Sequence, residues 1–127
     1  MEPRYLIDTN AALDFMGGKF AARAQEVMAA VMDDEINLSV INKIELLGFS
    51  RVEPPIEEFV RCANILPMDD AVVDKAIEVR RSCRMKLPDA IVAATALTAR
   101  LTLLTHNTKD FEKIKGLRLL DLHALER

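Results

Sequence analysis

The chain has 127 residues, half of them hydrophobic, and a formal net charge of −3. A chain of this length builds one hydrophobic core, so we expect a single domain over residues 1–127. This net charge is not the excess of Lys and Arg that is typical of nucleic-acid-binding proteins. No apolar run approaches the roughly 20 residues that a bilayer requires, and the first residues carry charges, which predicts a cytoplasmic protein outside the membrane. Cys62 and Cys83 have no nearby Cys or His partner, and we expect both to be reduced and buried.

The hydrophobic pattern alternates short strands with amphipathic helices along the chain. Strands are predicted at residues 4–7, 36–40, 65–66, 101–105 and 117–120. Helices are predicted at residues 20–32, 42–47, 55–63, 72–83, 88–97 and 108–114, so that two of the connections hold two helices each. Strands that are separated by helices and never joined by a tight hairpin favour a parallel sheet with helices on both faces. We therefore expect a three-layer α/β/α domain around a parallel sheet of about four to five strands.

Acidic side chains recur at one end of this predicted sheet. Asp8 directly follows the first strand, and Glu45 lies about a turn into the helix that leaves the second strand. Asp110 lies just past the fourth strand, and Asp89 lies in the first turn of the helix that leads into that strand. Because the loops at the carboxyl ends of parallel strands form one crevice, all four acids are expected at the same rim.

Each acid also has an ordinary structural explanation. Asp8 and Asp89 are suited to the start of a helix, where a carboxylate accepts backbone hydrogen bonds and meets the positive end of the dipole. Asn107 and Asp110 fit a capping arrangement, and Glu45 fits a solvated helix face. These explanations would have to hold separately for every acid and would leave the shared rim unexplained.

A cluster of carboxylates is costly unless a cation occupies it, because the charges repel one another. Oxygen ligands without Cys or paired His select Mg²⁺ or Mn²⁺, and such ions hold waters that can attack phosphorus. We expect Asp8, Asp89 and Asp110 to bind the metal, directly or through water, and Glu45 either to coordinate it or to orient and deprotonate the attacking water. Short polar side chains at the same rim are suited to holding the carboxylates in place. They are Thr9, Asn10, Thr105 and Asn107.

A basic segment lies directly ahead of Asp89. It contains Arg80, Arg81, Arg84 and Lys86 and no acid. These cations suit the C-terminal end of a helix, or they form a rim that contacts the phosphates of a nucleic acid. His106, in the loop before Asp110, could contact a phosphate but equally suits a solvent-facing loop.

Four segments of the chain together resemble the PIN-domain ribonucleases, and within them the short VapC-like toxins of bacterial toxin–antitoxin pairs. The segments are LIDTN with Asp8, INKIELLGF with Glu45, KLPDAIVAATA with Asp89, and LLTHNTKDF with Asn107 and Asp110. The resemblance implies a PIN fold, Mg²⁺- or Mn²⁺-dependent cleavage of RNA, and a homodimer. It also implies inhibition by a small antitoxin that covers the acidic pocket.

Two other functions use acidic pockets at the same end of a parallel sheet. A receiver-like signalling module would accept phosphate on an Asp after a later strand, and Asp69 and Asp70 follow a weakly predicted strand. A haloacid-dehalogenase-type phosphatase needs a second Asp two residues after its nucleophile, where this chain has Asn10. The residues therefore favour metal-assisted hydrolysis of a phosphodiester, with the receiver-like module as the alternative.

Overall fold

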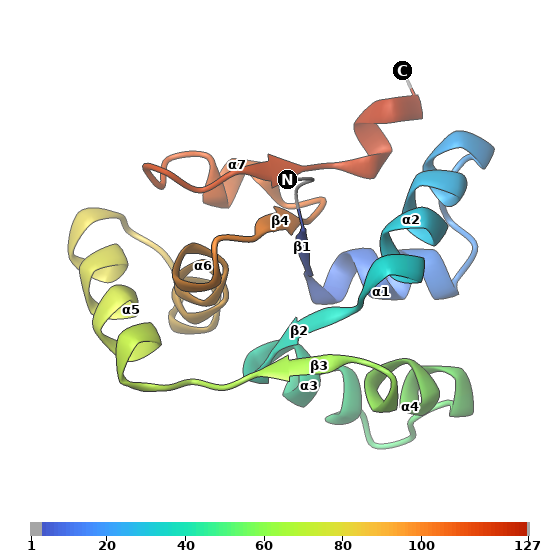
Figure 1. The fold of residues 1–127 in the computed structure, drawn as a ribbon, viewed down its shortest axis with the longest axis horizontal. Coiled ribbons are helices and arrows are strands. Elements are labelled where there is room, and N and C mark those ends of the chain that lie inside the picture. Colours follow the sequence, from blue (N-terminus) through green and yellow to red (C-terminus); the bar gives the residue numbers. More distant parts are fainter. Residues whose placement is uncertain (1–3, 127) are drawn as a thin grey trace.

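The computed structural model describes residues 4–126 as an α/β fold in which short strands alternate with helices (Figure 1). The strands are β1 (Tyr5–Ile7), β2 (Asn37–Ser39), β3 (Asn64–Leu66), β4 (Thr102–Leu104) and β5 (Leu119–Leu120). The helices are α1 (Thr9–Met16), α2 (Ala22–Asp34), α3 (Val40–Leu47), α4 (Pro54–Arg61), α5 (Asp70–Ser82), α6 (Leu87–Ala99) and α7 (Thr108–Phe111), followed by the 3-10 helix η1 (Leu122–Glu126).

The strands are all parallel but form two hydrogen-bonded ladders. One ladder has the order β1-β4-β5, and the other pairs β2 with β3. The side-chain amide of Asn37 donates a hydrogen bond to the backbone oxygen of Tyr5 at 3.0 Å, which joins β2 to β1. The single sheet expected from the sequence is therefore divided at this point, because a buried Asn side chain takes the place of a backbone ladder between two very short strands.

Alternate residues of the two central strands enter different cores. Leu6 and Leu103 pack with α6 and Phe111, whereas Ile7 and Leu104 pack against residues of α1, α2 and α3. This is the period-two geometry of strands, and it requires a sheet that is covered on both faces. Figure 1 shows α5 and α6 on one side of β1 and β4, and α1 and α2 on the other.

Some local predictions differ from the structure. Neither α1 nor η1 is among the predicted elements, so three connections rather than two hold a pair of helices. The helix predicted at 108–114 ends at Phe111, and α3 begins at Val40, two residues before its predicted start. Cys62 is exposed and Cys83 is half-buried, so the expected burial of both thiols is wrong, although both are free. Within residues 4–126 no helix combines the length and the hydrophobicity needed to cross a bilayer.

Candidate active site

Asp8 is the most buried of the candidate acids. Its backbone N–H donates to the oxygen of Leu104 at 2.9 Å, which extends the β1–β4 ladder by one residue before the chain turns into α1. Asp8 is the N-cap of α1, and its side chain is 8% exposed. A helix begins here because the carboxylate accepts the backbone N–H of Thr9, at 3.0 Å.

Four groups donate hydrogen bonds to the Asp8 carboxylate. Oδ1 accepts from the backbone N–H of Thr9 and from Nδ2 of Asn42 at 3.1 Å. Oδ2 accepts from the hydroxyl of Thr105 at 2.8 Å and from Nδ2 of Asn10 at 3.3 Å. Burial raises the pKa of Asp8; the hydrogen bonds from Thr105, Thr9 and Asn42 oppose the rise, and the charge of Glu45 adds to it.

The Thr105 hydroxyl can give its single proton only to Asp8, because its lone pairs are already used. It accepts the backbone N–H of Asn107 at 3.0 Å and the amide of Asn10 at 3.2 Å. The Asn10 oxygen in turn accepts the backbone N–H of His106, also at 3.0 Å. The start of α1 is thereby tied to the loop that follows β4.

Glu45 reaches the same site from α3. Its Oε1 accepts the hydroxyl of Thr9 at 2.7 Å, and Thr9 accepts an amide proton of Asn42 at 3.1 Å. Asn42 was not among the predicted site residues. The signal that could have found it is the spacing Ser39-x-x-Asn42, since an Asn in the third helical position can close a capping box and still offer an amide to a neighbour.

Asp89 provides the clearest sign that the acids converge. It lies in the first turn of α6 and is half-buried. Its pKa is raised, chiefly by desolvation and then by the negative charges of Asp8, Asp110 and Glu45, while Lys86 has a smaller opposite effect. Carboxylates from four separate segments therefore act on one another at this end of the fold.

Asp110 is exposed at the start of α7. The expected cap by Asn107 is absent, since the Asn107 side chain makes no capping bond to the backbone of α7. Its Nδ2 donates instead to Oδ2 of Asp110 at 2.8 Å. Asn107 thus holds the carboxylate directly.

The donor set is of the kind that hard divalent ions prefer, because it consists of carboxylate oxygens with neutral polar side chains behind them. The repulsion felt by Asp89, which Lys86 offsets only in part, is the charge deficit that a cation would fill. Among residues 4–126, however, no three His, Cys, Asp or Glu side chains are gathered closely enough to hold an ion as they stand. The oxygen donors at this site thus fit Mg²⁺ or Mn²⁺ by type. Binding of an ion would require the carboxylates to move closer together.

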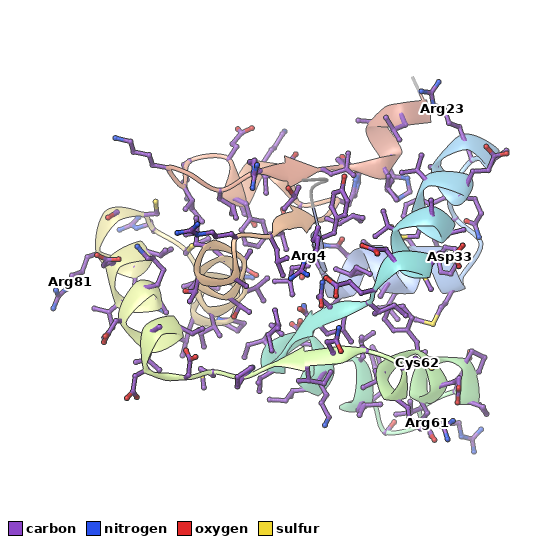
Figure 2. The ribbon with its side chains drawn as sticks, viewed as in Figure 1. Arg4, Arg23, Asp33, Arg61, Cys62 and Arg81 are labelled. Atoms are coloured by element: carbon purple, nitrogen blue, oxygen red, sulfur yellow. The ribbon has the colours of Figure 1, made fainter. Side chains whose placement is uncertain are left out.

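The predicted basic rim divides into separate parts. Lys86, the N-cap of α6, lies near enough to Asp89 to affect its pKa. Arg80 and Arg81 lie in the last turn of α5 instead, and Figure 2 shows Arg81 extending away from the body of the fold. Arg84 is exposed between the two helices, where its backbone oxygen accepts Nζ of Lys113 at 2.6 Å.

His106 is exposed, and its side chain contacts the C-terminal segment. Its Nδ1 lies 3.3 Å from Asp121, and its ring contacts that of His123 with 4.6 Å between the centroids. This side chain therefore joins the loop after β4 to the C-terminal segment, which supports the solvent-facing alternative over a phosphate contact.

Comparison with known proteins gives one family and a consistent set of folds. The PIN domain family model matches residues 5–117. A chain of a toxin–antitoxin complex from Klebsiella pneumoniae is 27% identical, with a TM-score of 0.72 and coverage of 93% of this chain and 97% of that one. A chain of the DNA-bound VapBC from Salmonella typhimurium is 20% identical, with a TM-score of 0.78 and coverage of 95% and 99%.

A third structure, VapBC-1 from nontypeable Haemophilus influenzae, is 22% identical, with a TM-score of 0.75 and coverage of 93% and 97%. No curated protein matches the sequence. The family model covers most of the chain and includes Asp8, Glu45, Asp89 and Asp110. The chain therefore belongs to the PIN-domain family.

Proposed function

We propose that this protein is a Mg²⁺- or Mn²⁺-dependent endoribonuclease, formed by one domain over residues 1–127, and that it is the toxin of a cytoplasmic toxin–antitoxin pair. One observation carries the proposal. The charges of Asp8, Asp110 and Glu45 all raise the pKa of Asp89, although the four acids come from four segments of the chain. Carboxylates near enough to repel one another in this way suit a divalent cation, on which they would draw together, and the cleavage of a phosphodiester.

The acids have different roles in this proposal. Asp8, Asp89 and Asp110 hold the cation, directly or through water. Glu45 either joins them or orients and deprotonates the attacking water, and Thr9 fixes its carboxylate by the 2.7 Å hydrogen bond. An ion held there would supply a water of lowered pKa and positive charge beside the phosphate.

The surrounding polar residues position these acids. Asn10 and Thr105 hold the Asp8 carboxylate on one side, and Asn107 holds Asp110. Lys86 is the cation best placed to meet an RNA phosphate, since it is the member of the basic segment with a resolved electrostatic effect on the site. Arg80, Arg81 and Arg84 would contact RNA only beyond the cleavage site.

The nuclease proposal is tested with purified protein, single-stranded RNA and Mn²⁺. Asp89→Asn should lower the cleavage rate at least about 100-fold, because one metal ligand and its charge are removed. Asp33→Asn is the matched control, since it makes the same chemical change at the exposed end of α2 (Figure 2). RNA cleavage that persists in excess chelator, or that is unchanged in Asp89→Asn, would rule the proposal out.

The receiver-like alternative has less support. The matched family is the PIN domain, and the carboxylate of Asp69 caps α5 by accepting the backbone N–H of Val72 at 3.0 Å. Incubation with a small phosphodonor distinguishes the two functions. A stable aspartyl-phosphate together with no RNA cleavage would favour the signalling module.

An antitoxin is the partner that the acidic site suits. The similar structures from Klebsiella pneumoniae and Salmonella typhimurium are a toxin–antitoxin complex and a VapBC assembly. An antitoxin that placed an Arg among Asp8, Asp89 and Asp110 would satisfy the same charge deficit as the metal and would exclude it. Such a partner should compete with Mn²⁺ for the site.

A second copy of the chain suits the outer face of α5. Val73 and Ile77 are one helical turn apart and are 41% and 44% exposed. They line a groove of about 360 Å³ that continues onto Leu87 of α6. Asp70 precedes them and Arg80 follows them at helical spacing on the same face, so an antiparallel copy of α5 would place each acid opposite an arginine. We propose this face as the surface of a homodimer.

A further inference from the structure

Asn42 lies buried between the start of α3 and two of the candidate acids. It is fully buried, and all its side-chain hydrogen-bonding groups are used. Its oxygen accepts the backbone N–H of Ser39 at 3.0 Å and the Ser39 hydroxyl at 2.7 Å. Its nitrogen donates to Oδ1 of Asp8 and to the hydroxyl of Thr9, both at 3.1 Å.

These partners fix the orientation of the amide. A flipped Asn42 would turn its oxygen toward the Asp8 carboxylate and its N–H groups toward the N–H of Ser39, so that like groups would face each other. Ser39 therefore selects the orientation in which both amide protons point into the site. The capping box of α3 therefore starts the helix and also holds the Asn42 amide in the orientation that donates to the site.

The Thr9 hydroxyl connects the Asn42 amide to the carboxylate of Glu45. Because the hydroxyl accepts an amide proton of Asn42, its own proton is free to be donated to Oε1 of Glu45, at 2.7 Å. Asn42 is thus bonded to one acid directly and to a second through Thr9. These two acids lie on different elements, at the end of β1 and in α3.

We propose that Asn42 is a positioning residue that sets the distance and orientation of Glu45 relative to Asp8. It has the combination that this role requires: complete burial, a single allowed amide orientation, and two donors aimed at two parts of the site. The consequence for cation binding rests on the proposed metal-dependent function. The hydrogen-bond relay itself does not depend on a metal.

The first test compares Mn²⁺ affinity with stability in two variants. Asn42→Leu removes both donors and keeps the number of side-chain heavy atoms, whereas Ser39→Ala removes the cap hydroxyl but leaves the backbone N–H that orients Asn42. Both variants should melt at a lower temperature than the wild type. Asn42→Leu should weaken Mn²⁺ binding, measured by the paramagnetic resonance of the free ion, about 10- to 100-fold, and Ser39→Ala less than about threefold.

Wild-type affinity in Asn42→Leu, or an equal loss in Ser39→Ala, would overturn the proposal, since the second result would mean that only the stability of α3 matters. If Asn42→Leu does not fold, Thr9→Val breaks the relay from its other end and should weaken Mn²⁺ binding by a similar factor. Lys43→Ala, at an exposed position of α3, is the control and should bind as the wild type does.

A second test needs no metal and therefore separates this inference from the nuclease proposal. In the nitrogen–proton spectrum of the apo protein, the side-chain amide protons of Asn42 should exchange slowly with water. Thr9→Val should shift them and speed the exchange of one proton, whereas Lys43→Ala should not. Fast exchange in the wild type would overturn the relay. If the wild type binds no Mn²⁺ but the amide is protected as described, the nuclease proposal fails and the positioning of Asp8 and Glu45 stands.

Discussion

Asp8 and Asp89 have raised pKa values for related reasons but stand in different surroundings. Burial is the largest cause for both. The Asp8 carboxylate accepts four hydrogen bonds, which offset part of the cost of burying its charge. For Asp89 the causes that follow burial are the like charges of its neighbours, and only Lys86 opposes them. The negative charge of Asp89 therefore destabilises the folded state when no cation is bound.

Removing the charge of Asp89 should stabilise the metal-free protein. Its folded pKa lies above the ordinary 3.8, so the folded state binds the proton more tightly. The resulting contribution to stability is present below pH 3.8 and is lost as the pH rises through the folded pKa. At neutral pH, Asp89→Asn should raise the free energy of unfolding by about 0.5–1 kcal/mol, a modest value because the carboxylate is half-exposed. Urea unfolding across pH measures this difference, which should shrink as the pH falls through the raised folded pKa and should be absent below 3.8.

Two comparisons make that result specific to the site. Saturating Mn²⁺ should reverse the order of stability, because the ion stabilises the wild type more than the variant. Asp8→Asn should destabilise the protein instead, by about 1–3 kcal/mol, since an amide would meet donors that now bond to a carboxylate. An Asp89→Asn protein that is less stable than the wild type at neutral pH would contradict the like-charge explanation.

At the scale of elements, the strands and the longer helices were predictable, whereas the short α1 and η1 were not. The amphipathic α5 and the mostly apolar α6 lie within one or two residues of the predicted ranges. The short α1 begins with Asp8 accepting the N–H of Thr9, a local bond that hydrophobic periodicity does not reveal. α7 ends early, since the N–H of Ile114 donates to the oxygen of Phe111 at 3.0 Å, which forms a turn instead of continuing the helix.

The end of α6 offers a test of how this helix is terminated. Arg100 has φ 58° and ψ 42°, and the N–H of the next residue, Leu101, donates to the oxygen of Ala96 at 2.9 Å. This left-handed conformation is typical of Gly and is strained for other residues. Arg100→Gly should therefore raise the free energy of unfolding by about 0.5–1 kcal/mol, with the added freedom of the unfolded chain limiting the gain. Thermal melts compare it with Arg100→Ala, which keeps the strain and should give no gain.

At the scale of the whole molecule, the convergence of the acids follows from parallel topology. Four segments that are far apart in sequence end at one rim because every strand runs in the same direction. Asn10 was expected at this rim, but its bond to Thr105 and that of Asn42 to Asp8 could not be predicted, since they depend on which donor faces which acceptor after folding. Likewise, a run of apolar residues does not indicate that an Asn side chain will divide the sheet between β1 and β2.

The proposed homodimer would form through the outer face of α5. Around a twofold axis near the middle of α5, Asp70 of one copy would lie opposite Arg80 of the other, and Val73 would lie opposite Ile77. Ile77→Asp should therefore make the protein monomeric in sedimentation equilibrium, because a charge would be buried in the contact between the two helices.

Charge reversal distinguishes this antiparallel pairing from a general apolar contact. Asp70→Arg and Arg80→Glu should each weaken the dimer by about tenfold or more, which corresponds to about 1.4 kcal/mol, and the double variant should recover most of the loss because each new charge again meets its opposite. Arg23→Glu on α2, an exposed arginine far from α5 in Figure 2, is the control. A double variant weaker than both single variants would exclude the antiparallel arrangement, and a wild type that stays monomeric at high concentration would exclude the dimer itself. Recovery in the double variant requires that the same two positions face each other across the axis, which no other pairing of α5 with itself provides.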